Sequence, residues 1–247
     1  MRTHPHIAIL GTVEVVGARR GTALPGSNLP ALLSLLALSP GRPVPNDRII
    51  EALWPEADPA KARRSLISLV HHLNATLAAQ FGIDRAVVSV KSVGRVLTID
   101  PSRIDVAEFE LRIAAAEVHE AHGDLAAAVD TYRSALRLWR GEPFGGADLA
   151  CFVEPSARLR ALRDRAESAL IGLSLRIGRG SALVPRLMQR TLDDPSDEAA
   201  ASDAARALYQ AGRSGEALRV LRSCMDERRL GRLPIGDEMR RLEVAVL

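Results

Sequence analysis

The stretch DPAKARRSLISLVHHLNATLAAQFG at residues 58–82 predicts one long helix with two different faces. Asp58 can cap its first turn, and Pro59 suits the first helical position. Five aliphatic side chains recur at helical spacing and form an apolar stripe: Leu66, Leu69, Val70, Leu73 and Leu77. This stripe is typical of a helix that packs against a core by one side.

The opposite face of the same helix carries hydrogen-bond donors and no carboxylate. Its residues are Lys61, Arg64, Ser68, His71 and His72. The basic residues fall in the first turns, where the helix dipole also favours an anion. A helix that packs by one face and presents donors on the other can lie against nucleic acid. The alternative is a surface helix whose basic side is simply solvated.

The residues around this helix predict a small mixed domain. Short β-branched runs at 6–10, 12–16 and 22–24 indicate an N-terminal sheet. Helices are expected at 29–38 and at 48–54, where Asn46 or Asp47 would be the cap and Pro55 the stop. Two β runs, at 87–90 and 95–99, flank a glycine-containing turn.

Strands, three helices and a hairpin, in this order, are the arrangement of a winged helix-turn-helix domain with an N-terminal sheet. The third helix would enter the major groove, and the hairpin would lie on neighbouring phosphates. The residues predicted to contact DNA are Lys61, Arg63, Arg64, Ser65, Ser68, His71, His72, Asn74, Lys91, Ser92 and Arg95. A small fold of this kind can also serve as a protein-docking module, and that alternative stays open.

Composition and charge agree with a two-part chain. The 247 residues are 47% hydrophobic and 26% charged, which predicts a globular protein. Aromatic residues are only 3%, so recognition of single strands by base stacking is not expected. Residues 1–100 hold eleven Lys and Arg against seven Asp and Glu, whereas residues 101–247 hold twenty-two against twenty-three. The positive charge therefore belongs to the first part.

Several sequence motifs, in this order, resemble those of the AfsR/SARP class of transcriptional regulators. They are AILGTVEVVG at 8–17, the segment from Leu32 to Leu66 that contains EALWPEADPAKARRSL, GRVLTID at 94–100, IDVAEFE at 104–110 and ALRLWRGEPF at 135–144. The resemblance covers the chain from Ile7 to Leu247. It implies an OmpR-like winged helix at 1–100 followed by a bacterial transcriptional activation domain at 104–247. It further implies binding to promoter repeats as a homodimer and recruitment of RNA polymerase holoenzyme, in control of a secondary-metabolism pathway.

The sequence departs from the pattern of this family at three places. His72 and Asn74 stand where the family carries arginine late in the third helix. Gly94-Arg95 replaces a Gly-Tyr pair in the wing, and Ser27-Asn28-Leu29 replaces a basic stretch. Lost arginines weaken phosphate neutralisation. A protein-interaction adaptor with a degenerate winged helix is therefore the competing hypothesis.

The second part is expected to be helical throughout, with helices near 106–123, 124–141, 155–177, 182–191, 197–211, 214–230 and 237–246. Small and large residues alternate at tetratricopeptide spacing at Ala128, Tyr132 and Ala135 and again at Ala217, Leu221 and Cys224. This half is expected to be an interaction platform. Trp139 and Phe144 are expected in its core.

Signatures of other protein classes are missing from the sequence. There is no Gly-rich phosphate loop, no HExxH and no nucleophile elbow, so neither catalysis nor a cofactor is expected. His4, His6, His71 and His72 lack clustered partners for a metal. Cys151 and Cys224 are expected to be core thiols in a reducing compartment. With no secretory signal or membrane-length apolar run, the protein is expected in the cytoplasm, without membrane contact.

Overall fold

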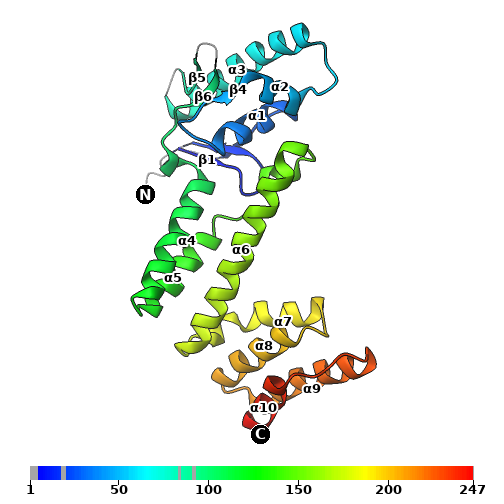
Figure 1. Cartoon of the computed structure of the whole chain (residues 1–247). Coiled ribbons are helices and arrows are strands. Elements are labelled where there is room, and N and C mark those ends of the chain that lie inside the picture. The colour runs from blue at the N-terminus through cyan, green and yellow to red at the C-terminus, as the bar shows by residue number, and fades with distance from the viewer. Residues whose placement is uncertain (1–4, 18–20, 83–84, 91–92, 247) are drawn as a thin grey trace. The chain divides into compact units, whose positions relative to one another are not determined.

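The computed structural model describes residues 5–17, 21–82, 85–90 and 93–246 (Figure 1). The chain is mostly helical with two small sheets, as the sequence predicts. By internal contacts it divides into two compact units. Unit 1 holds residues 1–115 and 133–164, and unit 2 holds residues 116–132 and 165–247. The boundaries between these two compact units therefore fall inside helices, whereas the sequence predicts a domain boundary between residues 100 and 104.

The first sheet of unit 1 is antiparallel in the order β1-β2-β3. Its strands are β1 (His6–Ala8), β2 (Glu14–Val16) and β3 (Gly21–Ala23). They are shorter than the β-branched runs of the sequence, and β1 has a specific reason to stop. The backbone N–H groups of Ile9 and Leu10 donate to the Asp105 carboxylate at 2.8–2.9 Å, so they are not available to a neighbouring strand.

Three helices follow, and their starts and stops obey the local sequence. They are α1 (Asn28–Ala37), α2 (Asn46–Leu53) and α3 (Pro59–Phe81). The Asp58 side chain accepts a hydrogen bond from the Lys61 backbone N–H at 2.9 Å, and Gly82 ends α3 in the left-handed conformation. Helix α2 differs from expectation, because it begins at Asn46 after Pro45 and no side chain caps it.

The second sheet has three strands, one more than the sequence predicts. The hairpin of β5 (Val87–Val90) and β6 (Gly94–Leu97) is joined by the two-residue β4 (Val44–Pro45), in the order β4-β6-β5. Gly94 belongs to β6 and not to the expected turn, and it pairs with Pro45. A Cβ at Gly94 would overlap the Val44 carbonyl, so only glycine permits this close approach.

The Asp105 carboxylate joins the first sheet to the start of the helical part within unit 1. Asp105 is 3% exposed and is the first residue of α4 (Asp105–Ala121). Arg140 lies 3.6 Å from this carboxylate and 3.4 Å from that of Glu14. Burial raises the pKa of Asp105 above its usual 3.8, and the hydrogen bonds from Ile9 and Leu10 and the charge of Arg140 oppose that effect.

Backbone pairing strengthens the same junction. The N–H groups of Arg140, Phe144 and Gly145 donate to the carbonyls of Leu10, Ile9 and Gly11 at 2.8 Å. These donors follow α5 (Leu125–Leu136) and enter the short 3-10 turn η2 (Pro143–Gly146); a similar turn, η1 (Pro101–Arg103), precedes α4. Residues 9–11 and 140–145, far apart in sequence, thus lie side by side.

Helix α6 (Ala150–Arg176) begins five residues before the sequence predicts, with Pro155 inside its N-terminal part. Phe144 is buried and stacks on Phe152, as expected of a core residue, whereas Trp139 is half-buried and meets Phe109 edge-on. Two arginines of α6 form ion pairs with acids of other elements: Arg158 pairs with Glu110 and Arg160 with Glu142.

Unit 2 is a layer of helices around an aliphatic core. After the 3-10 turn η3 (Gly180–Leu183) come α7 (Val184–Asp193), α8 (Glu198–Gln210), α9 (Ser214–Leu230) and α10 (Asp237–Val246). Helix α8 packs against both α7 and α9 (Figure 1). Ala217, Leu221 and Cys224 are all buried in this core, at the spacing that the sequence predicts. Cys151 differs from expectation, because it is only half-buried.

Candidate nucleic-acid interface

The site is built on α3, whose buried side is set by its aliphatic residues. Ala62, Leu66, Val70, Leu73 and Leu77 are buried. Leu69, expected in the same stripe, is only half-buried and lies at the margin of the exposed side. The side of α3 away from this core is therefore free to contact a partner.

Five of the residues predicted to contact DNA line one open groove of about 690 Å³. They are Lys61, Arg64, Ser65, Ser68 and His72. Two residues that the sequence analysis did not assign to the site complete the groove, namely Asn28 at the start of α1 and Trp54 at the end of α2. Three helices therefore contribute ammonium, guanidinium, hydroxyl, imidazole and indole groups to one surface. Ammonium, guanidinium and hydroxyl groups bind phosphate oxygens.

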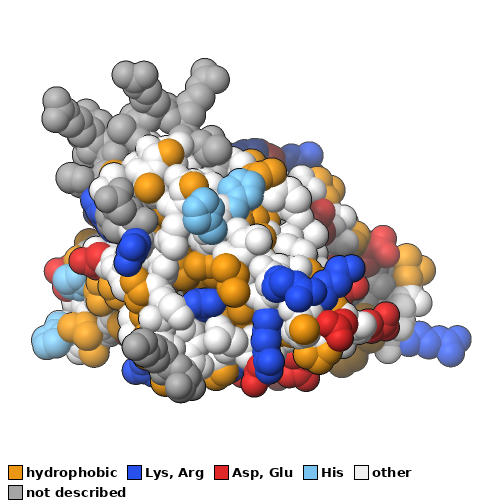
Figure 2. Space-filling view, turned by 90° about the horizontal axis from the view of Figure 1, so that it is seen from above, with side chains coloured by type: hydrophobic (Ala, Val, Ile, Leu, Met, Phe, Trp, Pro, Cys, Tyr) orange, Lys and Arg blue, Asp and Glu red, His pale blue; other side chains and the backbone are white. Residues whose placement is uncertain are grey.

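The cations of α3 have no acidic partner in the part of the chain that the structure describes. Lys61, Arg63 and Arg64 are exposed, and no ion pair or hydrogen bond of their side chains is found among the described residues. On the face seen in Figure 2, histidine and several Lys/Arg side chains lie in the middle of the view among uncharged atoms, whereas acidic side chains lie at the left, at the bottom and, beside a group of Lys/Arg side chains, at the lower right. This surface is suited to a negatively charged ligand.

Asn74 has a different role from the one predicted for it. Its side-chain amide donates to the Val87 carbonyl at 2.9 Å, and its carbonyl oxygen accepts from the Val87 N–H at 2.7 Å. Both polar ends of the half-buried side chain are engaged with the first residue of β5. Asn74 therefore attaches the hairpin to α3. The pattern of polar residues along α3 could not reveal this, because Val87 is thirteen residues away.

Arg63 and His71 are exposed but lie outside the groove. In the hairpin, Lys91 and Ser92 fall outside the described residues. Arg95 is half-buried in β6, opposite Val44 and Ser89, and its Nε is buried with no hydrogen-bond partner. The structure thus brings together five of the eleven predicted contacts and places Arg95 in β6, next to Gly94 at the turn end of the hairpin.

Trp54 and Asn28 carried weak sequence signals. Trp54 directly precedes the helix stop Pro55 and is one of two tryptophans in the chain. An aromatic residue at the end of a short helix is as compatible with a core position as with a site, and only the packing of α2 against α3 brings it to the groove. Asn28 had drawn notice only as part of the Ser27-Asn28-Leu29 stretch.

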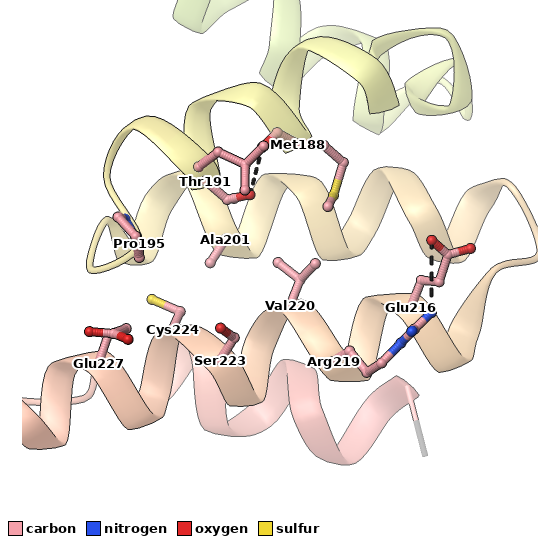
Figure 3. A pocket seen from close by; sticks show the side chains of 11 residues that line it. Met188, Thr191, Pro195, Ala201, Glu216, Arg219, Val220, Ser223, Cys224 and Glu227 are labelled. Atoms are coloured by element: carbon pink, nitrogen blue, oxygen red, sulfur yellow. Dashed lines mark hydrogen bonds and ion pairs between the residues drawn. The ribbon is translucent and has the colours of Figure 1, made fainter.

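Unit 2 carries a separate groove of about 430 Å³ between α7 and α9 (Figure 3). Met188, Val220 and Cys224 point into it, with Ala201 of α8 beneath them. Glu216 and Arg219 lie at one end and Glu227 at the other. Burial raises the pKa of the Cys224 thiol, so this cysteine is kept protonated and behaves as an apolar side chain. The groove has an apolar floor and charged ends, as protein-docking surfaces have.

No helix in the described ranges is long and apolar enough to cross a bilayer. Among the residues that can be described, no group of three His, Cys, Asp or Glu side chains is placed to hold a metal ion.

Comparison with known proteins identifies the family. Residues 104–247 match the family model of the Bacterial transcriptional activator domain. The chain is 32% identical to the transcriptional regulatory protein EmbR of Mycobacterium tuberculosis over 195 residues, which are 78% of this chain and 50% of EmbR. It is 28% identical to the regulatory protein DnrI of Streptomyces peucetius over 193 residues, 76% of this chain and 71% of DnrI.

A solved structure supports the same relationship over nearly the whole chain. Mycobacterium tuberculosis EmbR, solved in complex with a low-affinity phosphopeptide, superposes with a TM-score of 0.74 at 26% identity. The match covers 98% of this chain and 69% of that one, so the chain spans only part of the EmbR proteins, about half by sequence. These relatives regulate transcription, and the chain accordingly belongs to the AfsR/SARP class of transcriptional regulators, which carry the bacterial transcriptional activator domain.

Proposed function

We propose that this chain is a sequence-specific, duplex-DNA-binding activator whose α3 enters the major groove. The observation that carries the proposal is the set of exposed cations on α3, Lys61, Arg63 and Arg64, with no acidic partner among the described residues. Unpaired cations on one helix can bind phosphates without first breaking an ion pair inside the protein. The winged-helix arrangement of α1, α2, α3 and the β5–β6 hairpin supports the same function.

The groove beside α3 suggests how the individual side chains would contact DNA. Lys61 and Arg64 lie one helical turn apart, so they can meet successive phosphates, while Ser68 and His72 continue the line along the helix toward base edges. Trp54 and Asn28 form the opposite wall of the groove and would contact the sugar-phosphate backbone. We propose Lys91, Ser92 and Arg95 as the contacts of the wing. Asn74 supports the wing through Val87 and would not touch bases.

The experiment is a titration of DNA binding against salt with a charge-matched control. Duplex fragments from the neighbourhood of the protein's own gene are bound by the wild type, by a Lys61→Ala/Arg64→Ala variant, and by an Arg219→Ala/Arg240→Ala variant. The control loses the same charge from exposed positions of unit 2. Loss of two phosphate contacts should make the slope of log K against log salt shallower by about 1.8.

The control variant should keep the wild-type slope and the wild-type preference among fragments. Equal, weak binding to every fragment, unchanged when Lys61 and Arg64 are replaced, would contradict DNA recognition by α3. That result would favour the adaptor hypothesis, in which the winged helix no longer binds DNA and protein contacts carry the function.

For residues 104–247 we propose contact with RNA polymerase holoenzyme and self-association on promoter repeats, with residues 1–100 as the DNA-binding part. The family model over 104–247 supports an activating role, and the apolar groove between α7 and α9 offers a surface for it. Control of a secondary-metabolism pathway remains part of the proposal. A Val220→Asp variant should bind promoter DNA normally and lose activation in a reconstituted transcription assay; full activation would contradict the role of this groove.

A further inference from the structure

Ile67 is a large aliphatic residue on the exposed side of α3. Its side chain is 61% exposed, while Leu66 next to it is buried. It lies one turn from Arg63 and one turn from His71, so the three side chains form a row along the helix. We call this the Arg63–Ile67–His71 row. Arg64 and Ser68, which line the groove, follow Arg63 and Ile67 in sequence and lie beside this row.

Neither packing nor helix propensity accounts for an isoleucine at this place. A side chain that leaves more than half of its surface exposed contributes little to the core. Isoleucine is also a poorer helix former than the Lys, Arg, Glu, Leu or Ala that exposed helix positions favour, because its branched Cβ loses rotamer freedom. Other exposed aliphatic residues occur in this chain, but Ile67 stands on the proposed DNA-binding helix between Arg63 and His71, for whose side chains no partner is found among the residues that the structure describes.

We infer that Ile67 contacts the C5-methyl group of a thymine and so specifies that base. In the major groove only thymine presents an apolar group at its edge, since the other bases present hydrogen-bond donors and acceptors alone. Against cytosine or adenine, the apolar side chain of Ile67 would leave the polar groups of the base edge without a hydrogen-bond partner. Against thymine it removes apolar surface of both partners from water. The inference rests on the proposed function, because it requires α3 to lie in the major groove.

The surroundings of Ile67 select duplex DNA over an apolar protein partner. Arg63 and His71 in the row, and Arg64 beside it, have no acidic partner in the described part of the chain. A protein helix docked on Ile67 would place its own surface against the charges of Arg63 and Arg64 and would need acids to match them, whereas phosphates flank every base edge of a duplex. A single exposed isoleucine is also too small an area for a stable protein interface.

The test replaces thymine by uracil, which removes the methyl group and leaves base pairing intact. Operator duplexes are first recovered from a random-sequence pool with the purified full chain. Each thymine is then replaced in turn, and Kd is measured for wild type, Ile67→Ala and Ile67→Val. For the wild type, one uracil substitution should raise Kd about fourfold, which corresponds to one buried methyl group.

Ile67→Ala should bind the thymine operator more weakly and be insensitive to that same uracil, while Ile67→Val should keep the sensitivity. Ser68→Ala is the matched control: it alters a neighbouring contact and should leave the response to uracil unchanged. Sensitivity that persists in Ile67→Ala, or its absence from every thymine in the wild type, would overturn the inference while DNA binding stands. Failure to recover any operator would instead overturn the proposed function, and the inference with it.

Discussion

The basic residues on α3 of unit 1 differ from those on the helices of unit 2 in whether they form ion pairs. On α3, Lys61, Arg63 and Arg64 are exposed without a described acidic partner. In unit 2 arginines are matched with acids, in the pairs Arg186–Glu167, Arg190–Asp197, Arg206–Glu238, Arg213–Glu216, Arg222–Glu243, Arg228–Glu198, Arg229–Asp226 and Arg240–Asp237. The charge of a paired arginine is balanced by an acid of the same molecule, whereas an unpaired arginine is available to a ligand.

The comparison also shows why net charge alone says little about a binding surface. Residues 101–247 contain twenty-two basic residues, twice as many as residues 1–100, yet their twenty-three acidic residues leave no positive net charge. What distinguishes α3 is that no ion pair of Lys61, Arg63 or Arg64 is found within the described ranges. The five experiments below are given in descending order of expected effect.

The largest effect is expected at Asp105. Its carboxyl group is buried in unit 1, unlike the exposed cations of α3. Asp105→Ala leaves the buried N–H groups of Ile9 and Leu10 without an acceptor, which should cost about 2–6 kcal/mol of unfolding free energy. Urea unfolding measures it. A loss below about 1 kcal/mol would mean that water replaces the carboxylate.

Asp105 also predicts a pH dependence. Because burial raises its pKa above 3.8, the folded protein holds the proton more tightly than the unfolded chain. This contribution to stability is complete below pH 3.8 and is lost as pH rises through the folded-state pKa. Asp105→Asn has no proton to lose. The wild type should therefore lose stability relative to Asp105→Asn as pH rises above 3.8, and a constant difference would contradict the raised pKa.

A smaller effect is expected at Arg228, the most enclosed of the arginines paired in unit 2. Its side chain is 16% exposed, donates to the carbonyls of Ser196 and Pro234 at 2.6–2.9 Å, and lies 3.4 Å from Glu198. Arg228→Ala should lower the unfolding free energy by about 1–3 kcal/mol. Arg219→Ala is the matched control: at 77% exposure and 3.9 Å from Glu216 it should cost less than about 0.5 kcal/mol. Equal losses would show that pairing in unit 2 is not graded by burial.

Asn74 should show an intermediate effect on stability and an indirect effect on DNA binding. Asn74→Ala removes both hydrogen bonds to Val87 and should cost about 1–2 kcal/mol. His72→Ala, at an exposed position on the groove, should weaken DNA binding without a loss of stability. Thermal unfolding and operator binding of both variants separate the two roles. If Asn74→Ala lost affinity at unchanged stability, Asn74 would be a direct DNA contact.

The smallest effect, of opposite sign, is expected for Lys61 and Arg64. These like charges stand three residues apart on the exposed side of α3, so each destabilises the other. The Lys61→Ala/Arg64→Ala variant should therefore unfold at slightly higher denaturant, with a gain of a few tenths of a kcal/mol, although it binds DNA less well. A clear loss of stability would reveal partners for these cations and weaken the comparison.

Local signals predicted the elements of α3 well and the contacts of its neighbours poorly. Asp58, Pro59 and Gly82 specify the ends of the helix through a cap, a fixed φ and a left-handed residue, all within the chain segment itself. The two-residue β4 could not be predicted, because it exists only through its pairing with Gly94 and Arg95, fifty residues away. The early stop of β1 likewise depends on Asp105, which lies 96 residues from Ile9.

The sequence by itself indicated the family, through the resemblance of its ordered motifs. It also determined the helical class of the second part and the basic, acid-free side of α3, since both follow from residue identity and short-range periodicity. Tertiary structure alone decided which polar residues remain available for a ligand. Packing of α2 and α1 brings Trp54 and Asn28 to Lys61 and Arg64, while the approach of Val87 engages Asn74. Whether a donor is satisfied depends on groups distant in sequence, and folding is what brings them within hydrogen-bond distance.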